Sequence, residues 1–142
     1  KIARCGVAFY ASHDYADANG LPQQRGEWAE HRLIGFAGEA NEAELARWAG
    51  HVTRGAPTDL RCSSMADMVS AVRTHAGIAP LTCLQGDAHE DLVRVAPDKL
   101  FSATDVWLLA HPDLTNTPAV RAVLDFIAEA AKTDRDMLLG RV

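Results

Sequence analysis

LRCSSMADMVSAVRTHAGIAPL, residues 60–81, is the stretch that decides the fold. In order, it has the pattern of a strand end, a polar turn, a helix and a second strand. Ser64 and Asp67 have the S-x-x-D spacing of a capping box, in which the hydroxyl accepts a hydrogen bond from a free amide of the first turn. The acidic side chain also favours the positive end of the helix dipole. The pattern predicts a helix that begins at this serine.

The predicted helix has one apolar face, which we expect to pack on a core. Its members recur at helical spacing: Met65, Met68, Val69, Val72 and Ala76. Gly77 follows, where a left-handed cap favours a residue without a Cβ. Residues 78–81 then form a short apolar strand, in which Pro80 indicates an edge or a strand end.

The turn before this helix combines free backbone amides with small hydroxyls at Cys62, Ser63 and Ser64. Such a turn can hold a carboxylate or another small anion. The alternative is that Ser63 and Ser64 only complete the turn and cap the helix, and the local sequence favours this alternative. A ligand at this turn is therefore a hypothesis that needs support from the rest of the chain.

Several more elements precede this stretch. Residues 3–11 are rich in Val, Phe and Tyr and predict a long strand. Ser12 caps a short helix from which Tyr15 points inward. The remaining pattern predicts further segments: strands at 32–36 and 58–62, a helix at 41–49, and a strand at 92–95 with Arg94 pointing outward.

Two further elements follow. Residues 105–111 predict a strand that is buried on both faces. Thr117 caps the next helix, and Pro118 occupies its first position. The apolar face of that helix consists of Val120, Val123, Leu124, Ile127, Ala128 and Ala131. Because strands alternate with helices, we expect an α/β fold with mainly parallel pairing.

The composition is that of a globular protein of one domain. The 142 residues include 14 Lys and Arg against 19 Asp and Glu, a formal net charge of −5, so the chain lacks the basic footprint of a nucleic-acid-binding surface. It has no apolar run long enough to span a membrane and no secretory signal pattern. Cys5, Cys62 and Cys83 lack C-x-x-C spacing, which indicates free thiols in a reducing compartment, the cytoplasm.

The signatures of catalysis are missing from the sequence. The six histidines show no metal-ligand spacing, and there is no Walker motif, G-x-S-x-G elbow or G-x-G-x-x-G turn. Asp87, His89, Glu90 and Asp91 form an acidic segment that is more simply a solvated loop than a cation site. We predict no enzyme activity, no metal and no cofactor. A small α/β enzyme with Cys62 or Ser63 as nucleophile remains an alternative.

Five segments, in this order and spacing, together resemble the effector-binding (substrate-binding) domain of LysR-type transcriptional regulators. They are FYAS at 9–12, W-x-x-H-x-L-I-G-F at 28–36, R-C-S-S at 61–64, A-G-I-A-P-L at 76–81 and VWLLAHPDLTNTPAVRAVLDFIAE at 106–129. The resemblance runs from Arg4 to Ala131. The chain starts at Lys1 without an initiator methionine, so we interpret it as an N-terminally truncated member.

The resemblance implies a fold like that of type 2 periplasmic binding proteins, with one complete lobe and part of the second, joined by two crossover strands. On this interpretation the chain divides into a crossover strand from the first lobe at 1–12, the second lobe at 13–104, a return crossover strand at 105–111, the C-terminal helix of the first lobe at 112–133, and a tail at 134–142. The first-lobe helix would pack on the remaining sheet or on a second chain.

The resemblance also implies a ligand. A small effector, expected to be a carboxylate-bearing metabolite, would bind in the cleft between the lobes at Phe36, Ala37, Gly38, Cys62, Ser63, Ser64, Met65, Ile78 and Ala79. The protein would form a homodimer or homotetramer, and it would contact DNA only through an N-terminal helix-turn-helix region that this sequence lacks. An extracytoplasmic solute-binding protein of the same architecture is a second alternative, which a signal peptide upstream would favour.

Overall fold

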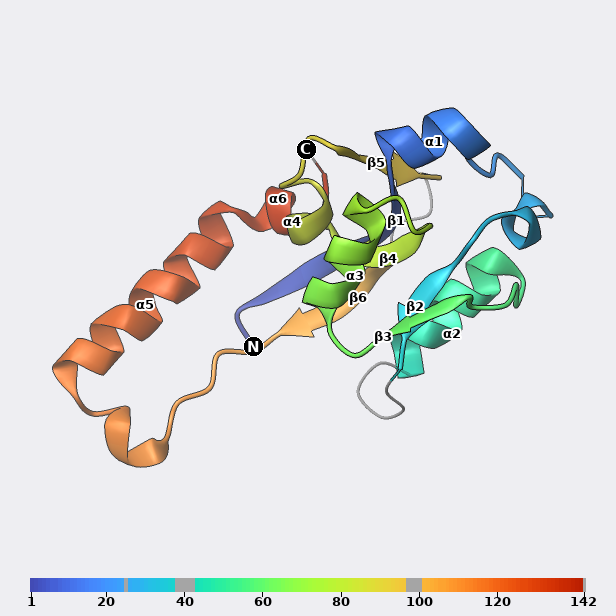
Figure 1. Cartoon of the computed structure of the whole chain (residues 1–142). Helices are drawn as coiled ribbons and strands as arrows, with labels where there is room; N and C mark the ends of the chain where they lie inside the picture. Colours follow the sequence, from blue (N-terminus) through green and yellow to red (C-terminus); the bar gives the residue numbers. More distant parts are fainter. Residues whose placement is uncertain (25, 38–42, 97–100, 142) are drawn as a thin grey trace.

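The chain is organised around one long buried strand, β1 (Ala3–Ser12), and the computed structural model describes residues 1–24, 26–37, 43–96 and 101–141 (Figure 1). Every residue of β1 from 5 to 12 is buried. It pairs with β4 (Ala79–Thr82), with β5 (Leu92–Val95) and, through its first half, with β6 (Phe101–Val106). A strand of this kind needs hydrogen-bond partners because its polar backbone has no access to water.

The strand directions differ from the prediction. All three partners of β1 run antiparallel to it. Within the described residues, parallel pairing is confined to β2 (Ile34–Phe36) with β3 (Leu60–Cys62) and to a bridge between Leu33 and Ile78. The prediction of mainly parallel pairing is therefore wrong. Alternation of strands and helices fixes the element order, but it does not fix the direction in which the chain returns to a central strand.

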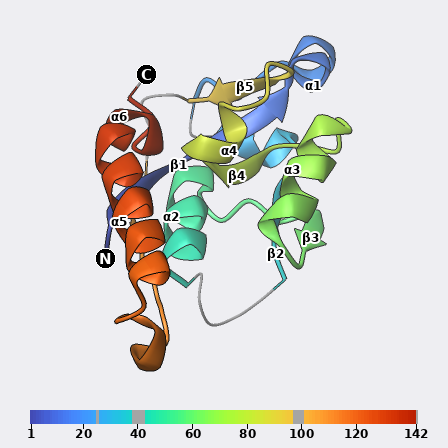
Figure 2. The same cartoon turned by 90° about the vertical axis from the view of Figure 1, so that its left-hand side faces the viewer.

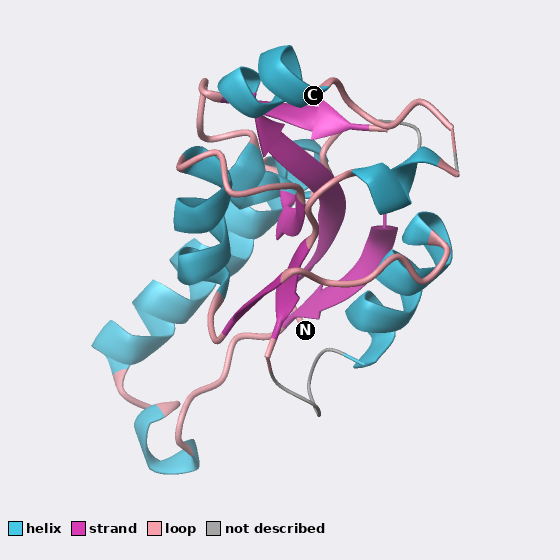
Figure 3. Ribbon diagram, turned by 45° about the vertical axis from the view of Figure 1, so that its right-hand side comes forward, coloured by secondary structure: helices cyan, strands magenta, loops and turns pink. Residues whose placement is uncertain are grey.

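Helices lie on both sides of the strands (Figure 3). Their bounds are α1 (His13–Asn19), η1 (Glu27–Glu30), α2 (Ala43–Thr53), α3 (Met65–Arg73), α4 (Cys83–Gly86), η2 (Pro112–Leu114), α5 (Pro118–Thr133) and α6 (Arg135–Leu138). Met68 and Val72 of α3 belong to one core with Leu81. A second core contains Phe9, whose ring centroid lies 4.7 Å from that of Trp28 and 5.0 Å from that of Trp48 on α2.

The predicted helix starts are confirmed. The Ser12 Oγ accepts a hydrogen bond from the Tyr15 amide at 3.1 Å, and Tyr15 is buried. α2 ends at Thr53, later than the predicted residue 49, and the predicted start at residue 41 lies outside the described residues. α3, in contrast, ends earlier than predicted, at Arg73. The residue that adopts a left-handed backbone after it is His75, with φ of 62°. Gly77 is needed for another reason: a Cβ there would overlap the carbonyl oxygen of Arg32.

The segment after β6 departs most from the prediction. β6 ends at Val106, so only residues 105 and 106 of the predicted strand lie in a strand, and the prediction for 107–111 is wrong. Trp107 and Leu109 are 62% and 85% exposed. α5 spans Pro118–Thr133 as its pattern predicts, but it buries none of its side chains, and Phe126 is 74% exposed. The expectation that its apolar face packs on the remaining sheet is wrong, and packing on a second chain stays a prediction.

A half-buried ion pair attaches the end of the chain to the sheet. Asp87 pairs with the Arg94 guanidinium and accepts a hydrogen bond from the Tyr10 hydroxyl at 2.7 Å. Arg94 also donates to the Gly140 carbonyl at 2.8 Å, and its side chain is only 19% exposed, so the expectation that it points outward is wrong. Burial, followed by the hydrogen bond to Asp87, raises the pKa of Tyr10, which keeps this hydroxyl protonated as a donor.

The contact between α4 and β1 makes the first testable prediction. A Cβ at Gly86 would overlap the Tyr10 ring, so Gly86→Ala is expected to lower the free energy of unfolding by about 1–3 kcal/mol through overpacking. Gly50→Ala, at a helical glycine with no heavy atom within 4 Å of the added Cβ, is the matched control and is expected to raise stability by up to about 1 kcal/mol. Urea unfolding of both variants measures the difference, and equal effects would contradict this packing.

Candidate effector site

Parallel pairing of β2 and β3 brings the carboxyl ends of both strands to the same edge of the sheet. The Ala37 amide donates to the Cys62 carbonyl at 2.8 Å. The Arg61 guanidinium donates to the Phe36 carbonyl at 3.3 Å. Crevices outside such strand ends are where open α/β sheets bind ligands. Phe36 and Ala37 therefore lie beside Cys62 as predicted, whereas Gly38 lies outside the described residues.

The N-terminus of α3 opens at this edge. The Ser64 Oγ accepts a hydrogen bond from the Asp67 amide at 3.1 Å, which confirms the predicted cap. The Ser63 hydroxyl donates to the Asp67 carboxylate at 3.1 Å, and both serines are exposed. Hydrogen bonding of the Asp67 carboxylate by the side chain of Ser64, and next by that of Ser63, lowers the pKa of Asp67. The start of α3 and the turn before it, residues 62–67, form a corner that offers amides and hydroxyls to a ligand. This corner already holds the negative charge of Asp67.

The remaining predicted site residues lie deeper. Cys62 is 8% exposed, and burial raises the pKa of its thiol, with a smaller contribution from the nearby Asp67 charge. Met65 is half-buried against the core that contains Met68 and Val72. Ile78 and Ala79 are fully buried, so they support this edge from within. A protonated, buried thiol is a poor nucleophile, because the thiolate is the reactive form.

A cavity of about 200 Å³ lies between β2 and α2, next to this edge. Its walls include Ile34, Gly35, Phe36, Leu45, Ala46, Ala49, Gly50, Thr53, Thr58 and Arg61. Phe36 and Arg61 belong both to the cavity wall and to the edge that α3 joins. The sequence analysis missed this cavity. The sequence feature that could have predicted it is the row of small residues on one face of α2, at Ala46, Ala49, Gly50 and Thr53. These side chains are too short to fill the space against the sheet.

The acidic segment at 87–91 is engaged by arginines. Asp87 pairs with Arg94, and Asp91 accepts from the Arg73 Nε at 2.8 Å, which lowers the pKa of Asp91. Over the part of the chain that the structure describes, no three histidine, cysteine or carboxylate side chains gather as a metal site. In the same part of the chain, no helix is both long and apolar enough to cross a bilayer.

The arrangement defines an α/β domain with a fold like that of type 2 periplasmic binding proteins, and its sequence identifies the group within that class. Residues 2–132 match the family described as LysR substrate binding domain, so the chain belongs to this family. That span agrees with the resemblance found from the motifs. The family consists of effector domains of transcriptional regulators and is not an enzyme family. No curated protein sequence matches the chain.

Solved structures of similar fold come from the same group of regulators. The regulatory domain of CrgA from Neisseria meningitidis is 22% identical, with a TM-score of 0.71 over 91% of this chain and 66% of that one. The effector domain of AmpR from Pseudomonas aeruginosa is 18% identical, with a TM-score of 0.71 over 94% and 64%. The effector-binding domain of QuiR, solved with shikimate, is 15% identical, with a TM-score of 0.53 over 93% and 64%. The chain thus spans just under two thirds of these domains.

The capping geometry makes the second prediction. Ser64→Ala removes the acceptor for the Asp67 amide and is expected to lower the free energy of unfolding by about 1 kcal/mol. Ser70→Ala, within the same helix and away from its first turn, is the control, with an expected change within about 0.5 kcal/mol. Chemical denaturation monitored by circular dichroism distinguishes the two. If both substitutions had the same small effect, Ser64 would not be the stabilising cap.

Proposed function

We propose that this chain is the effector-binding part of a LysR-type DNA-binding transcriptional regulator. The observation that carries the proposal is the meeting of the β2 and β3 carboxyl ends with the open N-terminus of α3, in a chain of this family. The proposed ligand is a small metabolite that is bound and released unchanged. Residues 13–104 would form the lobe that presents this edge, and the first-lobe segments that face it would belong to the rest of the regulator.

The effector is proposed to carry a carboxylate. Amides and hydroxyls at residues 62–65 would hold the anionic group, because the start of a helix favours negative charge. Phe36 would contact the apolar body of the ligand, and the adjoining cavity of about 200 Å³ suits a compact molecule. The shikimate bound to the QuiR effector domain is a carboxylate of that size class, which supports this assignment.

Regulation would act through conformational linkage and not through chemistry. An effector that binds one arrangement of the two lobes more tightly shifts the population toward it. A coupling free energy of roughly 1–3 kcal/mol is enough for a useful response. DNA contact would come from an N-terminal region of the regulator, in a cytoplasmic homodimer or homotetramer. The exposed apolar side chains of α5, including Val123 and Phe126, support a partner surface on that helix.

The third prediction tests the anion-binding corner. A thermal-shift screen of small organic carboxylates on a complete sensor domain is expected to yield a ligand that raises the melting temperature, because binding to the folded state stabilises it. Ser63→Ala should weaken that ligand about tenfold through loss of a hydroxyl donor to a charged group. Asp67→Asn should tighten it, because the competing negative charge is removed.

The matched control is the primary amide of the same ligand, which should bind far more weakly and should not respond to Asp67→Asn. The proposed role of residues 62–65 would be contradicted by a ligand whose acid and amide bind equally well. The same ligand would also show no change in affinity on Ser63→Ala or Asp67→Asn. Sequencing the gene upstream of residue 1 distinguishes a transcriptional regulator from a solute-binding protein. A helix-turn-helix there supports regulation, whereas a signal peptide supports an extracytoplasmic solute-binding protein.

The fourth prediction addresses the enzyme alternative. Because burial raises the pKa of Cys62, its thiol is expected to react with a thiol-specific probe more slowly at pH 7 than a thiol of the unfolded chain. Peptide mapping after timed labelling, with the urea-unfolded chain as reference, measures this rate for each cysteine. Rapid labelling confined to Cys62 in the folded protein would instead support a nucleophile.

A further inference from the structure

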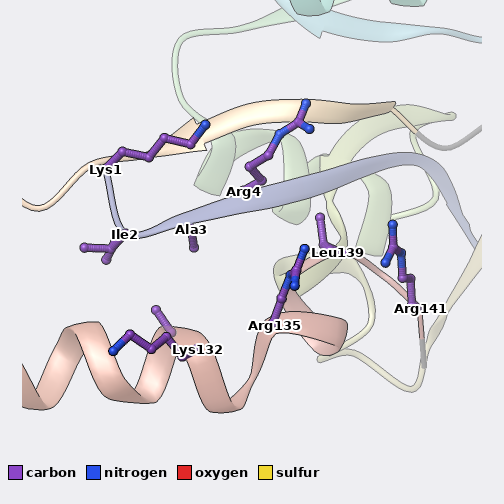
Figure 4. A pocket seen from close by; sticks show the side chains of 9 residues that line it. Lys1, Ile2, Ala3, Arg4, Lys132, Arg135, Leu139 and Arg141 are labelled. Carbon is purple, nitrogen blue, oxygen red and sulfur yellow. The ribbon is translucent and has the colours of Figure 1, made fainter.

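The cavity of about 200 Å³ beside α2 is enclosed by the interior of the fold. Its described walls come from β1, β2, α2, β4 and the segment 56–61, on the side of the molecule away from α5 (Figures 1 and 2). A larger groove, of about 590 Å³, lies between residues 1–4 and the C-terminal helices (Figure 4). The opening of that groove depends on where the sequence begins, whereas the opening of the cavity beside α2 does not.

The interior of this cavity is apolar. Phe9, Ile34 and Leu45 are buried in its walls. The Thr53 hydroxyl donates to the Ala49 carbonyl at 2.9 Å, so it is already used within the helix. An engineered cavity of about 150 Å³ with aliphatic and aromatic walls stays dry and binds benzene. The cavity beside α2 therefore has room for one aromatic ring with a small substituent.

The helix leaves this space open at a position where a larger side chain would fit. Gly50 lines the cavity, and a Cβ built on it would meet no heavy atom within 4 Å. Glycine inside a helix costs roughly 0.5–1 kcal/mol of stability relative to alanine. The chain thus has a helix-weakening residue beside unfilled apolar space, an arrangement in which a ligand completes the packing.

One hydroxyl at the wall is available to a ligand. Thr58 is half-buried, and across the described residues its hydroxyl makes no hydrogen bond. A Cβ at Gly35 would lie 3.5 Å from the Thr58 Oγ1, so this hydroxyl stands against β2. A partly buried hydroxyl is stabilised by a hydrogen-bond partner. The wall therefore favours a ring that carries one polar group.

That polar group is expected to be uncharged. Arg61 is the only charged side chain among the described wall residues, and it is exposed and donates to the Phe36 carbonyl at 3.3 Å. A carboxylate or an ammonium group inside the cavity would lie without an ion-pair partner, which is costly. A neutral hydroxyl matches the walls better.

We propose that the cavity between α2 and β2 binds a small uncharged phenol of one ring. The ring would lie among Phe9, Ile34 and Leu45, and its hydroxyl would bond to the Thr58 Oγ1. This site requires no carboxylate and no contact with residues 62–65, so it is separate from the proposed effector function. Phe36 and Arg61 belong to the cavity wall and to the neighbouring edge, so binding at the two places would be coupled.

Titration of the chain with p-cresol, followed by NMR of its methyl groups, tests the site. The resonances of Ile34 and Leu45 are expected to shift and to show contacts with the ring. Read at the same methyl groups, 2-naphthol should bind at least about tenfold more weakly, because close-packed walls do not admit a second ring. 4-Methylbenzoate should also bind at least about tenfold more weakly, since its charge would be buried unpaired.

Two substitutions locate the ligand. Gly50→Leu should weaken p-cresol by about tenfold or more, because the leucine side chain occupies the place of the ring. Gly50→Ala is the matched control, and the single added methyl group should change the affinity by less than about fourfold. Thr58→Val keeps the shape of the side chain without its hydroxyl. It should weaken p-cresol by about fivefold and leave toluene within about twofold, because toluene makes no hydrogen bond.

The opposite results would overturn the proposal. Equal affinities of Gly50→Leu and Gly50→Ala would contradict the location of the ligand, and tighter binding of 2-naphthol than of p-cresol would indicate an open apolar surface. Equal losses of p-cresol and toluene on Thr58→Val would contradict the hydrogen bond. Equal or tighter binding of 4-methylbenzoate at these methyl groups would contradict an uncharged ligand. Circular dichroism of each variant confirms that it is folded.

Discussion

The burial of β1 with both edges hydrogen-bonded is the constraint on which the rest of the structure depends. Residues 5–12 are inaccessible to water, so each of their backbone polar groups requires a partner in the protein. β4, β5 and β6 supply these partners from separate parts of the chain. Gly6 and Gly86 permit this crowding, because a Cβ at either would meet the Leu139 backbone or the Tyr10 ring.

This constraint also places the candidate effector corner. β4 pairs with β1, and its neighbour Ile78 bridges to Leu33, so the short parallel pair of β2 and β3 is fixed beside the central strand. α3 packs over that pair through Met68 and Val72, which directs its N-terminus to the carboxyl edge. The corner is thus built on rigid elements, with Ser63 and Ser64 left exposed at its surface.

Local sequence signals predicted the elements better than their arrangement. The caps at Ser12 and Ser64 and the helix start at Pro118 follow from side-chain chemistry within a few residues, and all three are confirmed. Strand direction and the end of β6 depend on distant partners, which hydropathy along the chain does not encode. Trp107 and Leu109 have the pattern of a buried strand but lie in solvent, since the described residues offer them no covering layer. The cavity beside β2 joins Ile34 to Ala49 of α2, a pairing of distant residues that no local motif predicts.

The contact of Arg94 with the last residues of the chain has a mechanical consequence. One guanidinium binds Asp87 after α4, the Tyr10 hydroxyl in β1 and the Gly140 carbonyl after α6. Separating the last residues of the chain from the sheet would leave a half-buried cation without one of its acceptors, so this contact opposes that separation. The end of the chain is thereby held to β1 and to the turn after α4, two segments that lie far from it in the sequence.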